Sequence, residues 1–184
     1  MKPGSRALGI AESYTGESST LAGIVQTAAG RLDGIVFGSC TVGGTDVTQS
    51  IIDLVHRLDR EDIRVVLVAG VALAWYNIVD MDELAKAIDP PVIAVTFEES
   101  EGLSAAIDAA FEGDDRDDRL ARYRSLPKRT AVEIAGQSMF IRTTSTGTDR
   151  ASELVDAYTP VGNNRPEPLR VAKLAARAVD EVYS

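Results

Sequence analysis

The chain has 184 residues, of which 45% are hydrophobic, and its formal net charge is -9. This length and apolar content predict one folded domain over residues 1–184 rather than a disordered chain. The single cysteine, Cys40, and the single histidine, His56, exclude an internal disulfide and any metal site built from several such residues. No apolar segment reaches the ~20 residues of a membrane span, and the N-terminus lacks an apolar signal region. We therefore expect a soluble, cytoplasmic protein.

The basic residues are dominated by arginine. Of the 19 basic residues, only four are lysines: Lys2, Lys86, Lys128 and Lys173. An acid-rich, lysine-poor composition is typical of a high-salt cytoplasm, because dense carboxylates keep the surface hydrated while salt screens their repulsion. Global acidity normally argues against nucleic-acid binding. In a salt-adapted protein this argument is weak, and local groups of arginines carry more information.

The first third of the chain has the pattern of an antiparallel meander. Short apolar segments at 6–13 and within 20–42 predict three strands, and the segment "AAGR" at 28–31 predicts a hairpin turn with glycine. Helical spacing of apolar residues follows at 46–58, with Asp46 as a possible N-cap.

Strands and helices then alternate. The predicted order is strand 64–70, helix 80–88, strand 92–97, helix 101–111, a charged helix and loop over 112–129, a hairpin around Gly136-Gln137, and helices 149–159 and 168–183. Three antiparallel strands followed by αβαβα predict an α/β fold with a ribonuclease-H-like mixed sheet. The last hairpin and helices are expected to form a small C-terminal extension.

Six segments carry a resemblance to a known family. In chain order they are "LGIAES", "DGIVFGSCTVGGTDVT", "REDIRVVLVAG", "WYNIVD", "VTFEESEGL" and "RPEPLRVAKLAAR". Together they resemble the archaeal DUF99 family, also called endonuclease dU, which is similar to endonuclease V. The resemblance covers the chain nearly end to end. It implies a magnesium-dependent nuclease that acts near a deaminated base, with deoxyuridine in DNA as the substrate associated with this branch.

The resemblance also implies metal ligands. Glu12 matches the strand aspartate of endonuclease V to within one residue, and Asp46 lies near the position of its helix glutamate. Both are predicted catalytic residues that bind Mg²⁺ (or Mn²⁺), which prefers carboxylate oxygens. Each has a simpler alternative, since Glu12 can be the solvated exit of a strand and Asp46 an ordinary helix cap.

Two positions depart from the endonuclease V pattern. Ala69 stands where endonuclease V has an aspartate before a glycine, so a carboxylate from elsewhere, with Glu98 as a candidate, would have to compensate. Lys173 stands near the position of a histidine or acid in the late helix. Lysine does not bind Mg²⁺ readily, but it can contact a phosphate, and we assign it a catalytic role as a charge stabiliser.

Aromatic and basic residues supply the expected nucleic-acid contacts. Trp75 or Tyr76 can stack on an unpaired base or belong to the core. Asn77 can bind a base edge or satisfy a loop backbone. Arg165 and Arg170, which flank a Pro-Glu-Pro helix start, are expected to bind phosphates.

These features support two functions. The first is a metal-dependent endodeoxyribonuclease that hydrolyses a phosphodiester near deoxyuridine or another deaminated base in DNA. The second is a nucleic-acid-binding protein of the same fold without catalysis, which Ala69 keeps open. The sequence leaves RNA open as a substrate, predicts no membrane partner, and does not indicate the oligomeric state.

Overall fold

The computed structural model describes residues 1–183. The strands are β1 (Arg6–Tyr14), β2 (Ser18–Thr27), β3 (Leu32–Thr41), β4 (Ile63–Val68), β5 (Ala72–Leu73), β6 (Asn77–Ile78), β7 (Val92–Thr96), β8 (Thr130–Ile134) and β9 (Gln137–Thr143). The helices are α1 (Val47–Leu58), α2 (Met81–Ala87), α3 (Ser104–Ala110), α4 (Gly113–Ser125), α5 (Thr148–Asp156) and α6 (Glu167–Tyr183).

One mixed sheet organises the molecule. Its strand order is β3-β2-β1-β4-β7-β9-β8, in which β1, β4 and β7 are parallel neighbours and the other pairs are antiparallel. The predicted meander of β1, β2 and β3 and the ribonuclease-H-like element order are confirmed. The last hairpin differs from expectation, because β9 pairs with β7 and extends the main sheet instead of forming a separate extension. A short hairpin of β5 and β6 was not predicted, because strands of two residues have no periodicity to detect.

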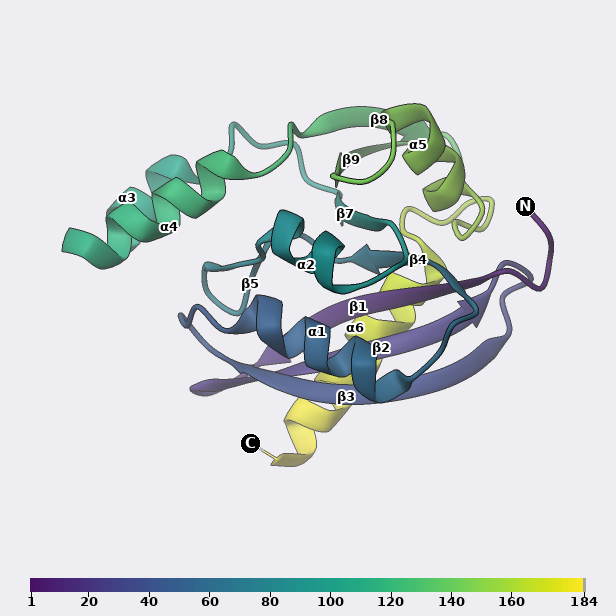
Figure 1. Ribbon diagram of the computed structural model, residues 1–184, viewed down its shortest axis with the longest axis horizontal. Coiled ribbons are helices and arrows are strands. Elements are labelled where there is room, and N and C mark those ends of the chain that lie inside the picture. The colour runs from purple at the N-terminus through teal and green to yellow at the C-terminus, as the bar shows by residue number, and fades with distance from the viewer. Residues whose placement is uncertain (184) are drawn as a thin grey trace.

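Helices cover both faces of this sheet (Figure 1). Apolar side chains of α1 and α2 pack with Leu8 and Ile10 of β1 on one face. On the other face, α5 and the start of α6 pack with Ala7 of β1 and with β4, β7 and β9. Helices α3 and α4 project together from the body of the molecule (Figure 1). No helix within residues 1–183 is both long enough and apolar enough to cross a bilayer.

Helix α6 lies unusually close to strand β1. A Cβ atom added to Gly9 would stand only 2.6 Å from both the Cβ and the carbonyl oxygen of Pro168. Glycine is therefore required in this strand by close backbone approach rather than by a turn. The contact fixes the first turn of α6 over β1, with Leu169 and Ala172 buried behind it. Every later α6 side chain, including Lys173, takes its position from this packing.

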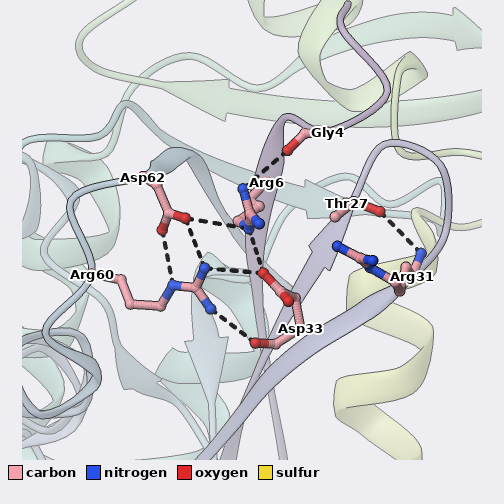
Figure 2. Close-up of polar contacts among 7 residues, drawn as sticks. All are labelled: Gly4, Arg6, Thr27, Arg31, Asp33, Arg60 and Asp62. Atoms are coloured by element: carbon pink, nitrogen blue, oxygen red, sulfur yellow. Dashed lines mark hydrogen bonds and ion pairs between the residues drawn. The ribbon is translucent and has the colours of Figure 1, made fainter.

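An ion-pair network joins three segments at the far end of the meander, where β1 begins. Figure 2 shows Arg6 of β1 and Arg60 of the α1–β4 loop both bound to Asp33 of β3, and both also contact Asp62. The Arg60 Nη2 to Asp33 Oδ2 distance is 3.0 Å, and Arg60 also donates to the Asp33 carbonyl oxygen at 2.8 Å. Hydrogen bonds from Arg6 and then Arg60 hold the pKa of Asp33 below its usual value, and Arg60 does the same for Asp62. The network therefore stabilises the fold while both carboxyls are ionised.

This arrangement predicts acid sensitivity. A carboxyl whose pKa is lowered in the folded state contributes stability above its unfolded pKa, about 3.9 for aspartate, and loses it as the pH falls through the folded value. We expect Asp33→Asn to lower the melting temperature at pH 7 and to have a progressively smaller effect below pH ~4. Thermal unfolding of both proteins across this range measures the difference. A constant difference between the two proteins at every pH would contradict the assignment.

Candidate active site

A cavity of about 300 Å³ opens where parallel strands β1, β4 and β7 end. Its walls come from these strand ends, from the segment after β7, from β9 and from α6. Ligand sites in open α/β sheets commonly lie outside the carboxyl ends of the strands. The volume falls at the lower end of the usual range for small-molecule sites, which suits one nucleotide-sized group.

Basic side chains outnumber acidic ones in the lining of this cavity. Four basic side chains line it, namely Arg129, Arg142, Arg165 and Lys173, against two acidic ones, Glu12 and Glu98. A local excess of positive charge in a chain of net charge -9 is the opposite of what its composition would give at random. Such a concave, positively charged surface concentrates anions, phosphate groups among them.

Each of the three arginines lies over an aromatic ring. The guanidinium carbon of Arg129 is 3.7 Å from the ring centre of Phe140, and that of Arg165 is 4.7 Å from the ring centre of Phe97. Arg142 lies 5.5 Å from the ring centre of Tyr123. Burial, together with the charge of nearby Arg129, lowers the pKa of Arg142, while Tyr123 opposes the shift. Stacking on rings orients guanidinium groups without neutralising them. Arg129 also donates to the Thr96 hydroxyl and to the carbonyl oxygens of Glu98 and Ser100, and Arg142 donates to the Pro127 carbonyl and the Tyr123 hydroxyl. These two arginines therefore add positive charge to the cavity, while most of their N–H groups are bound within the protein.

Glu12 is one of the two acidic residues that line the cavity. Its side chain is only 15% exposed, and one carboxylate oxygen accepts a hydrogen bond from the Ser19 hydroxyl at 3.0 Å. Lys173 donates to the backbone carbonyl oxygen of Glu12 at 2.6 Å, and its Nζ lies 3.7 Å from Oε1 of the same residue. The structure thus brings together two of the three predicted catalytic residues, Glu12 and Lys173.

Asp46 lies in a different environment. Its carboxylate accepts hydrogen bonds from the backbone and hydroxyl of Thr41 and from the side-chain amide of Asn77 at 2.7 Å, and it does not line the cavity. Although burial would raise the pKa of Asp46, the hydrogen bonds from Asn77 and Thr41 outweigh it and hold this pKa below the usual range. Asp46 also occupies the N-cap position of α1, but its side chain makes no capping hydrogen bond.

Asn77 completes this polar network. Its side chain is fully buried, accepts a hydrogen bond from the Val47 backbone at 3.1 Å and donates to the Thr41 carbonyl at 3.0 Å and to Asp46. Of the two roles considered for Asn77, the structure shows the second, which is to satisfy a loop backbone. The amide joins the end of β3, the start of α1 and strand β6, so it fixes the loop over residues 41–46.

Trp75 and Tyr76 lie in the tight turn between β5 and β6. Ala74, Trp75 and Tyr76 all have positive φ angles, of 43°, 61° and 56°. Three consecutive non-glycine residues in the left-handed region are a strained arrangement, and such strain often accompanies binding sites. Trp75 is 51% exposed rather than part of the core, and its ring meets Tyr76 edge to face at 5.3 Å between centres. The turn therefore exposes Trp75 outside the cavity lining, while Tyr76 packs on Phe111 at 5.9 Å between ring centres.

The two arginines of the Pro-Glu-Pro segment have different surroundings. Arg165 lines the cavity and forms none of the ion pairs found among residues 1–183. Arg170 is 2.6 Å from Oε1 of Glu167 and does not line the cavity. The hydrogen bond from Arg170 holds the pKa of Glu167 below its usual value. Only Arg165 therefore has the position and the free charge that a phosphate contact within the cavity requires.

The described carboxylates do not form a multi-ligand metal centre. Within residues 1–183, no group of three or more histidine, cysteine, aspartate or glutamate side chains is arranged to hold a metal ion. The strand positions of the cavity wall that pack towards α6 are Ala11 and Ala69, which offer only methyl groups. The residues present therefore do not fit a pair of Mg²⁺ or Mn²⁺ ions, for which several carboxylates must converge.

Sequence reasoning missed Arg129 and Arg142. Arg142 belongs to the last hairpin, which was expected to be a separate extension, and Arg129, at the end of the predicted charged segment, directly precedes that hairpin; pairing of β9 with β7 brings both to the cavity. A partial signal existed, because Phe140 and Arg142 alternate with the buried Met139 and Ile141 and so share one face of the strand. Only the pairing of β9 with β7 shows that this face meets the cavity.

Solved structures share the fold. A protein of unknown function from Archaeoglobus fulgidus matches with a TM-score of 0.83 and 24% identity, covering 95% of this chain and 97% of that one. Endonuclease V from Bacillus subtilis matches with a TM-score of 0.65 and 14% identity, over 97% of this chain and 82% of that one. Endonuclease V from Ciona intestinalis, in complex with DNA containing an inosine, matches with a TM-score of 0.63 and 12% identity, over 98% and 87% of the two chains. The fold is thus that of endonuclease V.

Sequence relatives extend over the whole chain. A UPF0215 protein of Pyrobaculum calidifontis is 32% identical over 96% of this chain and 98% of its own length. A UPF0215 protein of Pyrococcus horikoshii is 31% identical, over 89% of this chain and 83% of its own length. The family model described as Endonuclease dU matches residues 3–180. Because this match spans almost all of the 184 residues, the chain belongs to the Endonuclease dU family.

Proposed function

We propose that this protein binds DNA that contains deoxyuridine or another deaminated base, and that it hydrolyses a phosphodiester bond near that base. The observation that carries the proposal is the convergence of Arg129, Arg142, Arg165 and Lys173 in one cavity of an acidic protein. Membership of the Endonuclease dU family and a fold shared with endonuclease V support a nuclease that acts on DNA. The Ciona intestinalis endonuclease V was solved with inosine-containing DNA, which supports a deaminated base as the feature recognised.

The residues divide into three roles under this proposal. Arg165 and Lys173 contact the phosphate backbone, and Arg129 and Arg142 add positive charge; such electrostatic attraction supplies most of the affinity of proteins for DNA. Glu12, which lines the cavity beside Lys173, is the candidate general base. Trp75 and Tyr76 stack on a base that has left the duplex, which costs least when that base is mispaired. The sequence-based prediction of an Mg²⁺ or Mn²⁺ requirement, with Glu12, Asp46 and Glu98 as ligands, is the alternative to this role of Glu12; it has no support from the side chains of residues 1–183, because no three potential ligands are grouped there.

A second function is favoured by one observation. Ala69 stands on the cavity wall where endonuclease V has an aspartate, and its neighbour Ala11 also offers only a methyl group, so the chain can hold a phosphodiester there with fewer carboxylates to assist its hydrolysis. In that case the protein is a nucleic-acid-binding member of a nuclease family.

Labelled duplexes with uracil, hypoxanthine or only normal bases separate these functions. The protein is incubated with each duplex at low and at multimolar salt, because the acidic composition predicts a high-salt cytoplasm. Cleavage of the uracil duplex by the wild type, and its loss in Glu12→Gln, is the expected result. Tight binding without cleavage under every condition supports the second function, and the absence of both binding and cleavage contradicts both functions.

Arg165 and Arg170 provide a matched pair of variants. We expect Arg165→Ala to weaken DNA binding about tenfold or more, since a hydrogen bond to a charged group contributes ~1.5–3 kcal/mol. The slope of log K against log salt concentration should also become shallower by about 1, which is the loss of roughly one phosphate contact. Arg170→Ala should change neither quantity, because Arg170 is paired with Glu167 outside the cavity. Fluorescence anisotropy with a labelled duplex at several salt concentrations measures both.

An equal loss of DNA affinity in Arg165→Ala and Arg170→Ala would show that a position in the cavity lining does not decide which arginine binds phosphate. The assignment of the phosphate to the cavity would then be wrong, and the Pro-Glu-Pro segment as a whole would be the contact surface.

A further inference from the structure

We infer that the ammonium group of Lys173 takes the place in this cavity that a divalent cation would hold, so that the protein binds a phosphodiester without a metal ion. The inference rests on the proposed function, because it concerns how the same cavity holds the same class of ligand. The inference predicts metal-independent DNA binding, and it predicts the same for any cleavage that the protein performs.

The position of the ammonium group is the first argument. Lys173 Nζ lies 2.6 Å from the carbonyl oxygen of Glu12 and 3.7 Å from Oε1 of the same residue. A backbone carbonyl and a carboxylate oxygen at the end of a strand are the types of donor that hard divalent cations use. Here a positive charge supplied by the chain is already bound to them, and a second cation would meet its repulsion.

The rigidity of α6 is the second argument. Lys173 follows Ala172, which is fully buried, and Leu169, which is 2% exposed, on a helix whose first turn lies against Gly9 of β1. Because the backbone of α6 has no free space towards β1, the lysine stem starts from a fixed point. A charge that is held in place before the ligand arrives costs little reorganisation on binding.

The methyl groups of the cavity wall that faces α6 are the third argument. The cavity positions that pack towards α6 are Ala11 on β1 and Ala69 after β4, with Ala172 and Ala175 on α6 itself. This apolar wall leaves Glu12 as the carboxylate in contact with Lys173. A site of net positive charge that includes Arg142 and Arg165 favours an anion over a divalent cation.

Manganese and DNA test the inference with independent readouts. The electron paramagnetic resonance signal of free Mn²⁺ reports how much ion the protein sequesters, and the anisotropy of a labelled uracil duplex reports DNA binding in EDTA and in Mn²⁺. We expect the wild type to bind less than one Mn²⁺ per chain. Its dissociation constant for DNA in EDTA should lie within a factor of two of the constant in Mn²⁺. Lys173→Met should weaken DNA binding about tenfold or more in both solutions. Any cleavage by the wild type should persist in EDTA.

A charge-reversal variant tests whether the position of the Lys173 ammonium group can hold a metal cation. Lys173→Glu places a carboxylate beside the Glu12 oxygens, and we expect it to bind one Mn²⁺ per chain. Its DNA binding should be lost in EDTA and recover when Mn²⁺ is added, which a lysine with a purely structural role would not produce. Lys2→Glu, with the same charge change at an exposed position outside the cavity, is the matched control and should show neither effect.

The possible failures are distinguishable. Sequestration of Mn²⁺ by the wild type, together with DNA binding that disappears in EDTA, overturns the inference and leaves the proposed function intact. Unchanged DNA binding by Lys173→Met in EDTA also overturns it. If the wild type binds no DNA under any condition, the proposed function fails and the inference fails with it, whatever the Mn²⁺ signal shows.

Discussion

Gly9→Ala is expected to lower the free energy of unfolding by about 3 kcal/mol, because overpacking of a tight interface usually costs ~1–3 kcal/mol and the obstacle here is backbone. The new Cβ would stand 2.6 Å from the carbonyl oxygen of Pro168, far inside van der Waals contact. A flexible side chain could turn away, but the first turn of α6 can relieve the clash only if the helix moves. Unfolding in urea, followed by circular dichroism, measures the loss.

The same substitution should also weaken the site. Arg165, Leu169 and Lys173 line the cavity from the segment that Gly9 positions, so a displaced α6 moves them together. We expect weaker DNA binding by Gly9→Ala under conditions where the variant is still folded.

Gly34→Ala is the matched control for Gly9→Ala. Gly34 is also a strand glycine, in β3, but its added Cβ would approach only side-chain atoms, those of Val25 at 3.4 Å and Arg60 Nη1 at 3.7 Å. We expect a change within about 1 kcal/mol and in the stabilising direction, since alanine restricts the unfolded chain more than glycine does. Identical denaturant midpoints for Gly9→Ala and the wild type would refute the close packing of α6 on β1.

Asn77→Asp is expected to destabilise the protein by roughly 3–5 kcal/mol at pH 7, the range for an uncompensated buried charge. The change is nearly isosteric, but it replaces the amide donor that lies 2.7 Å from Asp46 and 3.0 Å from the Thr41 carbonyl with a second acceptor. Two carboxylates and a carbonyl would then face one another in a buried position. Asn77→Ala should cost less, about 1–3 kcal/mol, because it removes the hydrogen bonds without adding a charge.

The pH dependence separates charge from packing. Burial and the neighbouring Asp46 would raise the pKa of the new carboxyl in the folded protein. The loss in free energy of unfolding therefore begins above the pKa of the unfolded state, about 3.9, and grows until the pH reaches the pKa of the folded state. The destabilisation by Asn77→Asp should therefore shrink towards pH 4, while that of Asn77→Ala should stay nearly constant. Thermal unfolding of both variants from pH 4 to pH 8 provides the comparison.

Asn164→Asp makes the same chemical change at an exposed position and should leave the melting temperature nearly unaltered. If Asn77→Asp behaves like Asn164→Asp, the hydrogen-bonded link between β3, α1 and β6 does not exist in solution. The fixed conformation of the loop over residues 41–46 would then need another explanation.

The sequence by itself determined most elements of the fold and their order. Hydrophobic periodicity located β1, β2 and β3, helix α1 and the buried strands β4 and β7, because each is long enough to show a period of 2 or 3.6 residues or a continuous apolar run. The resemblance of the sequence to endonuclease V singled out Glu12 and Lys173, which lie in contact, and the departures at Ala69 and Lys173, both of which line the cavity.

The tertiary structure decided which of these residues act together. Asp46, a predicted metal ligand, and Asn77, a predicted contact to a base edge or to a loop backbone, are hydrogen-bonded to each other, while Arg165 and Arg170, five residues apart, lie in different environments. Local sequence does not determine these surroundings, because they depend on residues distant in the chain. Asn77 contacts Asp46 across 31 positions, and Arg142 lines the cavity only because β9 pairs with β7. Local periodicity specifies elements, whereas the charge that surrounds a side chain is set by the packing of elements against one another.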